Sequence, residues 1–133
     1  LEVAYRAQAG VRAAARRQTS IPPSSPYADS SWYPDYLREY EATFLMRWKP
    51  FVYFRRAPFA GRFINVDEEG IRSTPHVQPD ASDTVRIMFF GGSTMWGSNL
   101  RDSATIPAVV AKRLAAIGRP NVTFSLLNLG ESG

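Results

Sequence analysis

Residues 85–94, Val-Arg-Ile-Met-Phe-Phe-Gly-Gly-Ser-Thr, predict a buried strand followed by a tight turn. The first six are mostly apolar, and a short apolar run bounded by turn residues is typical of a buried strand. The run ends abruptly at Gly91 and Gly92, which allow the chain to turn tightly. Ser93 is therefore expected at the carboxyl end of a strand.

A helix and a second strand are expected after this turn. The helix is predicted at about 104–117, with Asp102 or Ser103 as its N-cap and Gly118 as its C-terminal stop. Its apolar face is expected to consist of five aliphatic residues, namely Ile106, Val109, Val110, Leu114 and Ile117. Residues 122–129 predict the second strand. A strand, a helix and a strand in about 45 residues form a βαβ unit, so the two strands are expected to be parallel.

The two glycine-containing turns, at 91–93 and 130–133, lie at the carboxyl ends of these strands, where open parallel sheets bind ligands. If the strands are neighbours, the backbone N–H groups of Ser93 and Gly130 converge, and a tetrahedral oxyanion needs two such donors. The residues alone leave three interpretations open: a serine nucleophile beside half of an oxyanion hole, an anion or phosphate cradle, and a purely structural turn. Neither common phosphate-binding glycine motif is present, nor is a Gly-x-Ser-x-Gly elbow.

Composition limits the class of protein. The chain has 133 residues, of which 44% are hydrophobic and 21% charged, so it is long enough for one ordinary globular domain. It contains no cysteine, which excludes a disulfide framework, a thiolate metal site and a cysteine nucleophile. No apolar run reaches the roughly 18 residues that a transmembrane helix needs.

Charge is unevenly distributed, although the net charge is only +4. Segments 1–20 and 38–62 are rich in arginine, whereas segment 66–83 is acidic. A basic surface of this kind binds nucleic acid or an anionic membrane in some proteins. We favour a solvated surface with internal ion pairs and expect no nucleic-acid partner, while membrane proximity stays open.

Residues 1–84 predict an irregular helical and aromatic extension before the βαβ unit. Segment 1–17 is rich in alanine and arginine and predicts a helix, either the flank of a lost membrane anchor or an ordinary surface helix. Segment 18–31 is rich in proline and serine and predicts a linker, and segment 32–84 forms the rest of the extension.

Aromatic residues dominate the first part of segment 32–84. A stripe at helical spacing predicts a helix from Tyr33 to Trp48: Tyr33, Leu37, Tyr40, Phe44 and Trp48. We favour packing of this stripe on the core over contact with a membrane surface, which is the alternative. Short strands are expected at 51–54 and 63–66. A turn is expected at 67–70, where Gly70 is free to take a positive φ.

Three segments resemble motifs of the SGNH/GDSL hydrolases. Residues 90–97, Phe-Gly-Gly-Ser-Thr-Met-Trp-Gly, resemble the first block of a bacterial branch in which Gly-Gly-Ser-x-x-x-Gly replaces Gly-Asp-Ser. Residues 128–133, Asn-Leu-Gly-Glu-Ser-Gly, resemble the second block, and residues 65–72 resemble the Asn-x-Asp-x-x-Gly-Ile/Phe-Arg lead-in of the same branch. The resemblance covers roughly residues 60–133, with one helix and one strand between the two blocks.

This resemblance implies an α/β fold in which residues 85–129 start the three-layer, flavodoxin-like parallel sheet of the family. It implies acyl transfer through Ser93, with the N–H groups of Ser93 and Gly130 as oxyanion donors. Candidates for the substrate pocket are Gly92, Thr94 and Trp96. The substrate would be an ester or an O-acylated molecule, and no metal or organic cofactor is implied.

A serine hydroxyl is a weak nucleophile without an adjacent base, and the family takes its base from a later Asp and His that have no counterpart here. The only histidine, His76, precedes Ser93 and is interpreted as a loop residue. We therefore expect residues 85–133 to be the first part of a truncated hydrolase domain. The 133-residue chain alone is expected to show no esterase activity above a Ser93→Ala control.

The predicted sheet is also incomplete, because two parallel strands and one helix leave edges and a face uncovered. A missing C-terminal portion or a partner chain would complete it. With a partner chain, the protein becomes a catalytically inactive structural or interaction subunit of a larger assembly. Since an N-terminal membrane anchor with an exported catalytic domain is common in the branch, the resemblance also implies an extracytoplasmic or membrane-anchored location in a bacterium.

Overall fold

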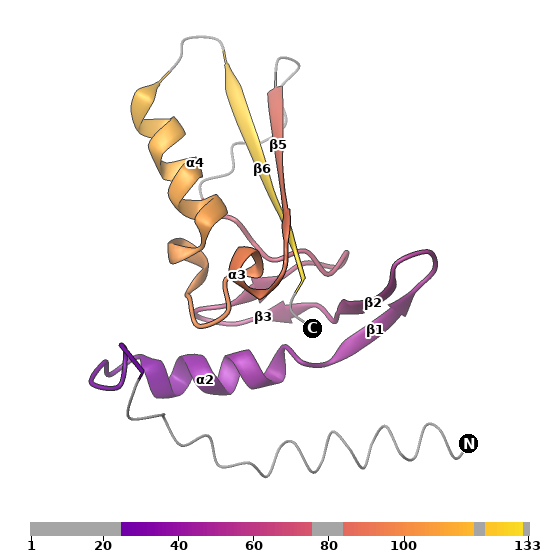
Figure 1. Ribbon diagram of the computed structural model, residues 1–133, viewed down its shortest axis with the longest axis vertical. Coiled ribbons are helices and arrows are strands. Elements are labelled where there is room, and N and C mark those ends of the chain that lie inside the picture. Colours follow the sequence, from indigo (N-terminus) through magenta and orange to yellow (C-terminus); the bar gives the residue numbers. More distant parts are fainter. Residues whose placement is uncertain (1–24, 76–83, 119–121, 132–133) are drawn as a thin grey trace.

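The computed structural model describes residues 25–75, 84–118 and 122–131 (Figure 1). The elements along these residues are helix α2 (Tyr33–Ala42), strands β1 (Met46–Lys49), β2 (Tyr53–Arg56), β3 (Phe59–Ala60), β4 (Asn65–Val66) and β5 (Thr84–Gly91), helix α3 (Ser93–Trp96), the short 3-10 helix η1 (Asp102–Ala104), helix α4 (Ile106–Ile117) and strand β6 (Thr123–Gly130). The predicted helix at 1–17, the first half of the linker at 18–31, and His76 lie outside the described residues. The fold is mixed α/β with small sheets.

Strands β5 and β6 form the predicted βαβ unit with α4. The two strands are parallel, in a register that runs from Thr84 opposite Thr123 to Gly91 opposite Gly130. Figure 1 shows α4 beside this pair of strands. The helix ends at Ile117 and is followed by Gly118, the predicted stop, which has a φ of 52°.

The beginning of α4 differs from the prediction. Neither Asp102 nor Ser103 caps it; both belong to η1. The N-cap is Thr105, whose hydroxyl oxygen accepts a hydrogen bond from the Ala108 N–H at 3.3 Å. The Asp102 carboxylate instead forms an ion pair with Arg72, 30 residues earlier in the chain. It is therefore not available to cap the helix.

The buried face of α4 also differs. Its buried residues are Pro107, Ala108 and Ala111, whereas Val109 is 42% exposed and Ile117 is 69% exposed. Small residues allow a helix axis to come close to a strand, and this close approach to β6 turns the larger aliphatic residues outward. Consequently, the predicted aliphatic stripe is largely uncovered in the described residues.

The predicted helix at 33–48 is too long. Helix α2 ends at Ala42, and Thr43 terminates it with a hydroxyl hydrogen bond of 2.7 Å to the Tyr40 carbonyl. The chain then forms an antiparallel hairpin in which β1 pairs with β2, Trp48 lying opposite Phe54. Strand β2 begins at Tyr53 rather than at residue 51, because residues 50–52 form the turn of the hairpin.

A single aromatic core joins the helical region to the turn that follows β5. Its buried members come from α2, from the segment around β4 and from α3: Tyr33, Tyr36, Leu37, Phe63, Ile64, Val66 and Trp96. Figure 1 shows α2 below the βαβ unit, with the β3–β4 region between them. Two antiparallel bridges, from Arg72 to Val66 and from Arg72 to Asn128, link β4 to β6. The helix that follows the Gly-Gly-Ser turn therefore packs, through Trp96, on residues far away in the sequence.

Candidate functional site

The two glycine turns lie side by side, as the parallel arrangement predicted. Gly91 and Gly130 are opposite each other in the register, and the Glu131 N–H donates to the Gly91 carbonyl at 2.9 Å. Ser93 is the first residue of α3, directly after the extended Gly92. Gly92, Ser93 and Thr94 are all exposed, so the candidate nucleophile is open to a substrate.

Glycine is required on both strands because α3 sits directly on their ends. A Cβ atom on Gly130 would lie 2.4 Å from the backbone nitrogen of Trp96. A Cβ atom on Gly91 would lie 2.8 Å from the Cβ of Met95. By contrast, the nearest atom to a Cβ on Gly92 would be 3.9 Å away. Gly91 and Gly130 thus fix α3, and Ser93 with it, against the sheet.

The two expected oxyanion donors differ in their surroundings. The Ser93 N–H belongs to the first turn of α3, where N–H groups have no acceptor within a helix. The Gly130 N–H already donates to the side-chain oxygen of Asn128, at 3.1 Å. The Asn128 side chain also donates to the Trp96 carbonyl, at 3.3 Å. An oxyanion at this position would therefore share or displace the Asn128 bond, which the sequence did not indicate.

Trp96 supports the turn rather than lining a pocket. Its side chain is 1% exposed, in contrast to the pocket position expected for it. Two guanidinium groups lie against its ring: that of Arg56 is 4.1 Å from the ring centroid and that of Arg72 is 4.3 Å away. Cation–π contacts of this kind are strongest when they are shielded from water. The ring therefore connects the root of the hairpin, through Arg56, with the helix that carries Ser93.

Arg72 holds the loop that follows α3. Its Nε donates to Asp102 Oδ1 at 2.8 Å, and its Nη1 donates to the carbonyls of Trp96 at 3.0 Å and Gly97 at 2.8 Å. Its Nη2 donates to the Leu100 carbonyl. A planar guanidinium suits this task because it presents several donors in fixed directions. Arg72 thereby binds the last residue of α3, the next residue and the loop beyond.

The rest of the 65–72 motif presents Arg72 to this loop. The Asp67 carboxylate accepts from the N–H groups of Glu69 at 3.0 Å and Ile71 at 2.8 Å, which closes the predicted turn. Gly70 has a φ of 80°, as expected. Asn65 donates to the second oxygen of Asp102 at 3.0 Å. The pattern in the sequence indicated the turn, but it did not show that Asp102 is the shared acceptor.

A second ion pair lies beside the glycine turns. Arg55 Nη1 is 3.1 Å from Glu131 Oε1, and both side chains are largely covered. Burial raises the pKa of Glu131, while the charges of Arg55 and Arg56 oppose this rise. Burial also raises the pKa of Asp102, and its hydrogen bond with Arg72 opposes that rise. The sequence placed Glu131 in the turn next to that of Ser93, but it did not indicate that Arg55 is its partner.

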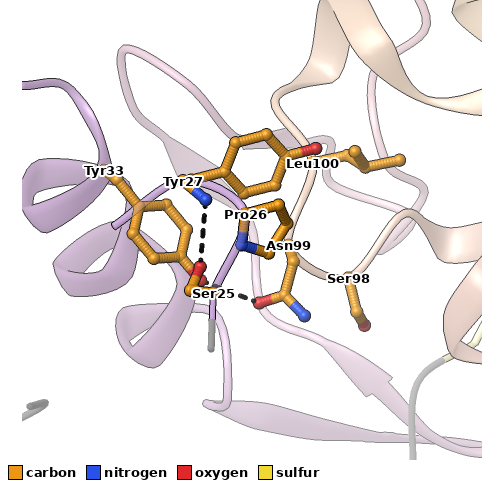
Figure 2. Close-up of a pocket in the computed structure, with 7 residues that line it drawn as sticks. All are labelled: Ser25, Pro26, Tyr27, Tyr33, Ser98, Asn99 and Leu100. Carbon is orange, nitrogen blue, oxygen red and sulfur yellow. Dashed lines mark hydrogen bonds between the residues drawn. The ribbon is translucent and has the colours of Figure 1, made fainter. Parts of the chain in front are cut away.

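A pocket of about 430 Å³ lies at a different place on the molecule. Figure 2 shows its lining, which comes from residues 25–27, from Tyr33 and from residues 98–100. The Tyr33 hydroxyl donates to the side-chain oxygen of Asn99 at 3.4 Å. The pocket does not include Ser93, so its position does not support a role in acyl transfer.

Comparison with known proteins found no match to this chain, either among family models or among curated proteins. Among the described residues, no helix is both long and apolar enough to cross a bilayer. In the same part of the chain, no three His, Cys, Asp or Glu residues are grouped so that they would hold a metal ion.

Proposed function

We propose that this chain carries the nucleophile of an SGNH-type serine ester hydrolase or O-acetyl esterase. The observation that carries the proposal is the parallel register of Gly91 and Gly130, with α3 placed closely on both glycines. This arrangement presents the exposed Ser93 at the carboxyl ends of two neighbouring strands. Ligand sites of open parallel sheets occur at this position.

In the proposed reaction, Ser93 Oγ attacks the carbonyl carbon of an ester and passes its proton to a base. The carbonyl oxygen becomes an oxyanion, which the N–H groups of Ser93 and Gly130 stabilise. Collapse of the tetrahedral intermediate breaks the C–O bond, and the alcohol leaves with a proton. Water then attacks the acyl group on Ser93 and releases the acid. No histidine is present in the described residues, so the base would come from outside them.

We further infer that β5 and β6 belong to a larger, flavodoxin-like parallel sheet. Met88 and Phe90 of β5 are 51% and 69% exposed, and Val109 and Ile117 of α4 are also uncovered. Parallel strands are normally covered on both faces, so these apolar residues favour additional elements from a C-terminal portion or from a partner chain. By the same family resemblance, we propose a location outside the cytoplasm of a bacterium or at its membrane.

The alternative function is a catalytically inactive structural or interaction subunit. The specific observation in its favour is the Gly130 N–H, which already donates to Asn128. The buried Trp96 and the uncovered apolar residues of β5 and α4 are compatible with this function as well. The motif would then be retained because α3 and its two glycines support the fold.

Hydrolysis of p-nitrophenyl acetate distinguishes these two functions. The assay compares the protein isolated from its natural source with its Ser93→Ala variant, and tests the 133-residue chain in parallel. A hydrolase shows turnover that disappears in the variant, and the 133-residue chain is expected to show none. Absence of Ser93-dependent turnover in the protein from its natural source would favour the structural subunit.

A further inference from the structure

Near its tip, the β1–β2 hairpin carries an aromatic pair on one face and basic residues on the other, while Arg56 lies on the aromatic face at the root. Residues directly opposite each other in an antiparallel pair project to the same side, and successive residues alternate. Trp48 lies opposite Phe54, and their rings are 5.5 Å apart. Trp48 is 60% exposed and Phe54 is 57% exposed. Arg47 and Lys49 alternate with this aromatic pair and project to the other side.

The tip of the hairpin is apolar and uncovered. Phe51 is completely exposed, with a relative accessibility of 102%, and Val52 is 44% exposed. Phe51 also has a φ of 65°, a conformation that is unusual for a bulky residue. Figure 1 shows that the hairpin projects from the body of the protein, on the side away from α4. The described structure thus presents an aromatic side chain at the end of a projecting element.

All charged residues of the hairpin itself, residues 46–56, are basic. No aspartate or glutamate occurs between residues 42 and 66, whereas the hairpin contains Arg47 and Lys49 near its tip. Glu68 approaches Arg47 at 3.8 Å, but both side chains are mostly exposed, and exposed ion pairs of this kind are weak and exchangeable. An apolar tip with basic residues beside it is complementary to an anionic surface that has an apolar interior.

We propose that the β1–β2 hairpin docks on the surface of an anionic phospholipid bilayer. Phe51 and Val52 enter the boundary between headgroups and acyl chains, and the rings of Trp48 and Phe54 lie at headgroup level. Tryptophan and other aromatic residues favour this interface, and basic residues interact there with lipid phosphates. The required depth is that of a few side chains, so no membrane-spanning helix is involved.

The root of the hairpin is fixed to the body of the protein. Arg56 is 1% exposed, stacks on Trp96 and donates to the Thr43 carbonyl at 2.7 Å. Arg55 pairs with Glu131, next to Gly130. Since these contacts end at the turns that surround Ser93, docking of the hairpin brings that region toward the bilayer. The docking proposal itself does not depend on catalysis by Ser93.

Vesicle sedimentation with the 133-residue chain tests this proposal. Binding is compared between vesicles of phosphatidylcholine alone and vesicles that also contain phosphatidylglycerol. We expect binding to the anionic vesicles, weakened several-fold by about 0.5 M salt because screening reduces the attraction of the basic residues. Phe51→Ser combined with Val52→Ser is expected to weaken binding about tenfold or more, because both side chains lose favourable burial.

Ile117→Ser is the matched control, since Ile117 is also an exposed apolar residue, 69% accessible, on the distant helix α4. Its binding is expected to stay within about twofold of the parent chain, because surface substitutions away from an interface have small effects. Arg47→Gln with Lys49→Gln provides a second test that keeps the apolar tip: it should remove most of the preference for anionic vesicles. Circular dichroism confirms that each variant is folded.

Three results would overturn the proposal. The tip variant binds anionic vesicles as tightly as the parent chain; the control loses as much binding as the tip variant; or the parent chain binds no vesicles. A concentration-dependent dimer that disappears in the tip variant, without vesicle binding, would assign the hairpin to a second copy of this chain instead.

Discussion

Replacing Arg72 by Met removes the group that holds the loop after α3. The Arg72 side chain is completely buried, and that of its partner Asp102 is 8% exposed. The change deletes the 2.8 Å ion pair with Asp102 and the hydrogen bonds to the carbonyls of Trp96, Gly97 and Leu100. Methionine fills part of the volume but donates no hydrogen bond. The variant therefore isolates the contribution of the guanidinium group.

The expected loss is large for a domain of this size. Removing one partner of a buried ion pair costs about 3–5 kcal/mol, because the remaining charge is left buried. Asn65 still donates to Asp102 at 3.0 Å, which favours the lower end of this range. Domains have free energies of unfolding of about 5–15 kcal/mol, so the variant is expected to be marginally folded.

The loss should also depend on pH. Burial raises the pKa of Asp102 and Arg72 opposes the rise, so the pKa is expected to increase further in the variant. A carboxyl group whose folded pKa is raised destabilises the fold when charged, and this penalty disappears as the pH falls through that pKa. The difference between variant and parent should therefore be largest near neutral pH and decrease toward about pH 4.

Urea unfolding followed by tryptophan fluorescence measures both effects. The double variant Arg72→Met/Asp102→Asn should recover part of the loss, because it removes the uncompensated buried charge. A difference below about 1 kcal/mol would refute the argument, since that is the size expected for an exposed pair. A pH-independent difference would show that Asp102 is not the residue left uncompensated.

Three further predictions concern single contacts. Gly130→Ala should lower the free energy of unfolding by about 1–3 kcal/mol, because its Cβ would lie 2.4 Å from the Trp96 nitrogen. The control is Gly92→Ala, whose Cβ would lie 3.9 Å from the nearest atom; it should change the free energy of unfolding by less than about 1 kcal/mol. If chemical denaturation shows similar losses of stability for both variants, the close approach of α3 to Gly130 is contradicted. Thr105→Ala should lower the free energy of unfolding by about 1 kcal/mol, because α4 loses its N-cap. Ser103→Ala is the control and should not lower it. Equal melting temperatures for these two variants would argue against the Thr105 cap. Asn128→Ala should lower the melting temperature, because the Gly130 N–H loses its 3.1 Å acceptor; an unchanged melting temperature would mean that this bond contributes little.

The βαβ unit was predictable because its signals are local. The apolar runs of β5 and β6, and the glycines that end them, directly indicated strands and turns. The hairpin was not, because Tyr33 to Trp48 also fits helical spacing. Trp48 pairs across the hairpin with Phe54, six residues later, and this cross-strand pairing overrides the helical periodicity. The α4 face was mispredicted because periodicity follows large apolar residues, whereas Ala108 and Ala111 make the close contact.

For the candidate site, the sequence predicted the neighbouring glycine turns but not their support. That Gly91 lies opposite Gly130 follows from two parallel strands of equal length. The position of Trp96 between Arg56 and Arg72 depends on three separate segments meeting in space, and no local pattern encodes it. The same holds for the bond from Gly130 to Asn128, because it depends on the side-chain conformation of Asn128.

The most direct test of a nucleophilic Ser93 is the position at which a fluorophosphonate reacts with the protein isolated from its natural source. Such reagents form an adduct with a serine that a neighbouring base activates. Trypsin releases residues 87–101, which contain Ser93 and Ser98, and fragmentation in a mass spectrometer distinguishes the two serines. We predict an adduct on Ser93 that is absent from the Ser93→Ala variant. An unmodified Ser93, or an adduct on Ser98 instead, would contradict a nucleophilic role for Ser93.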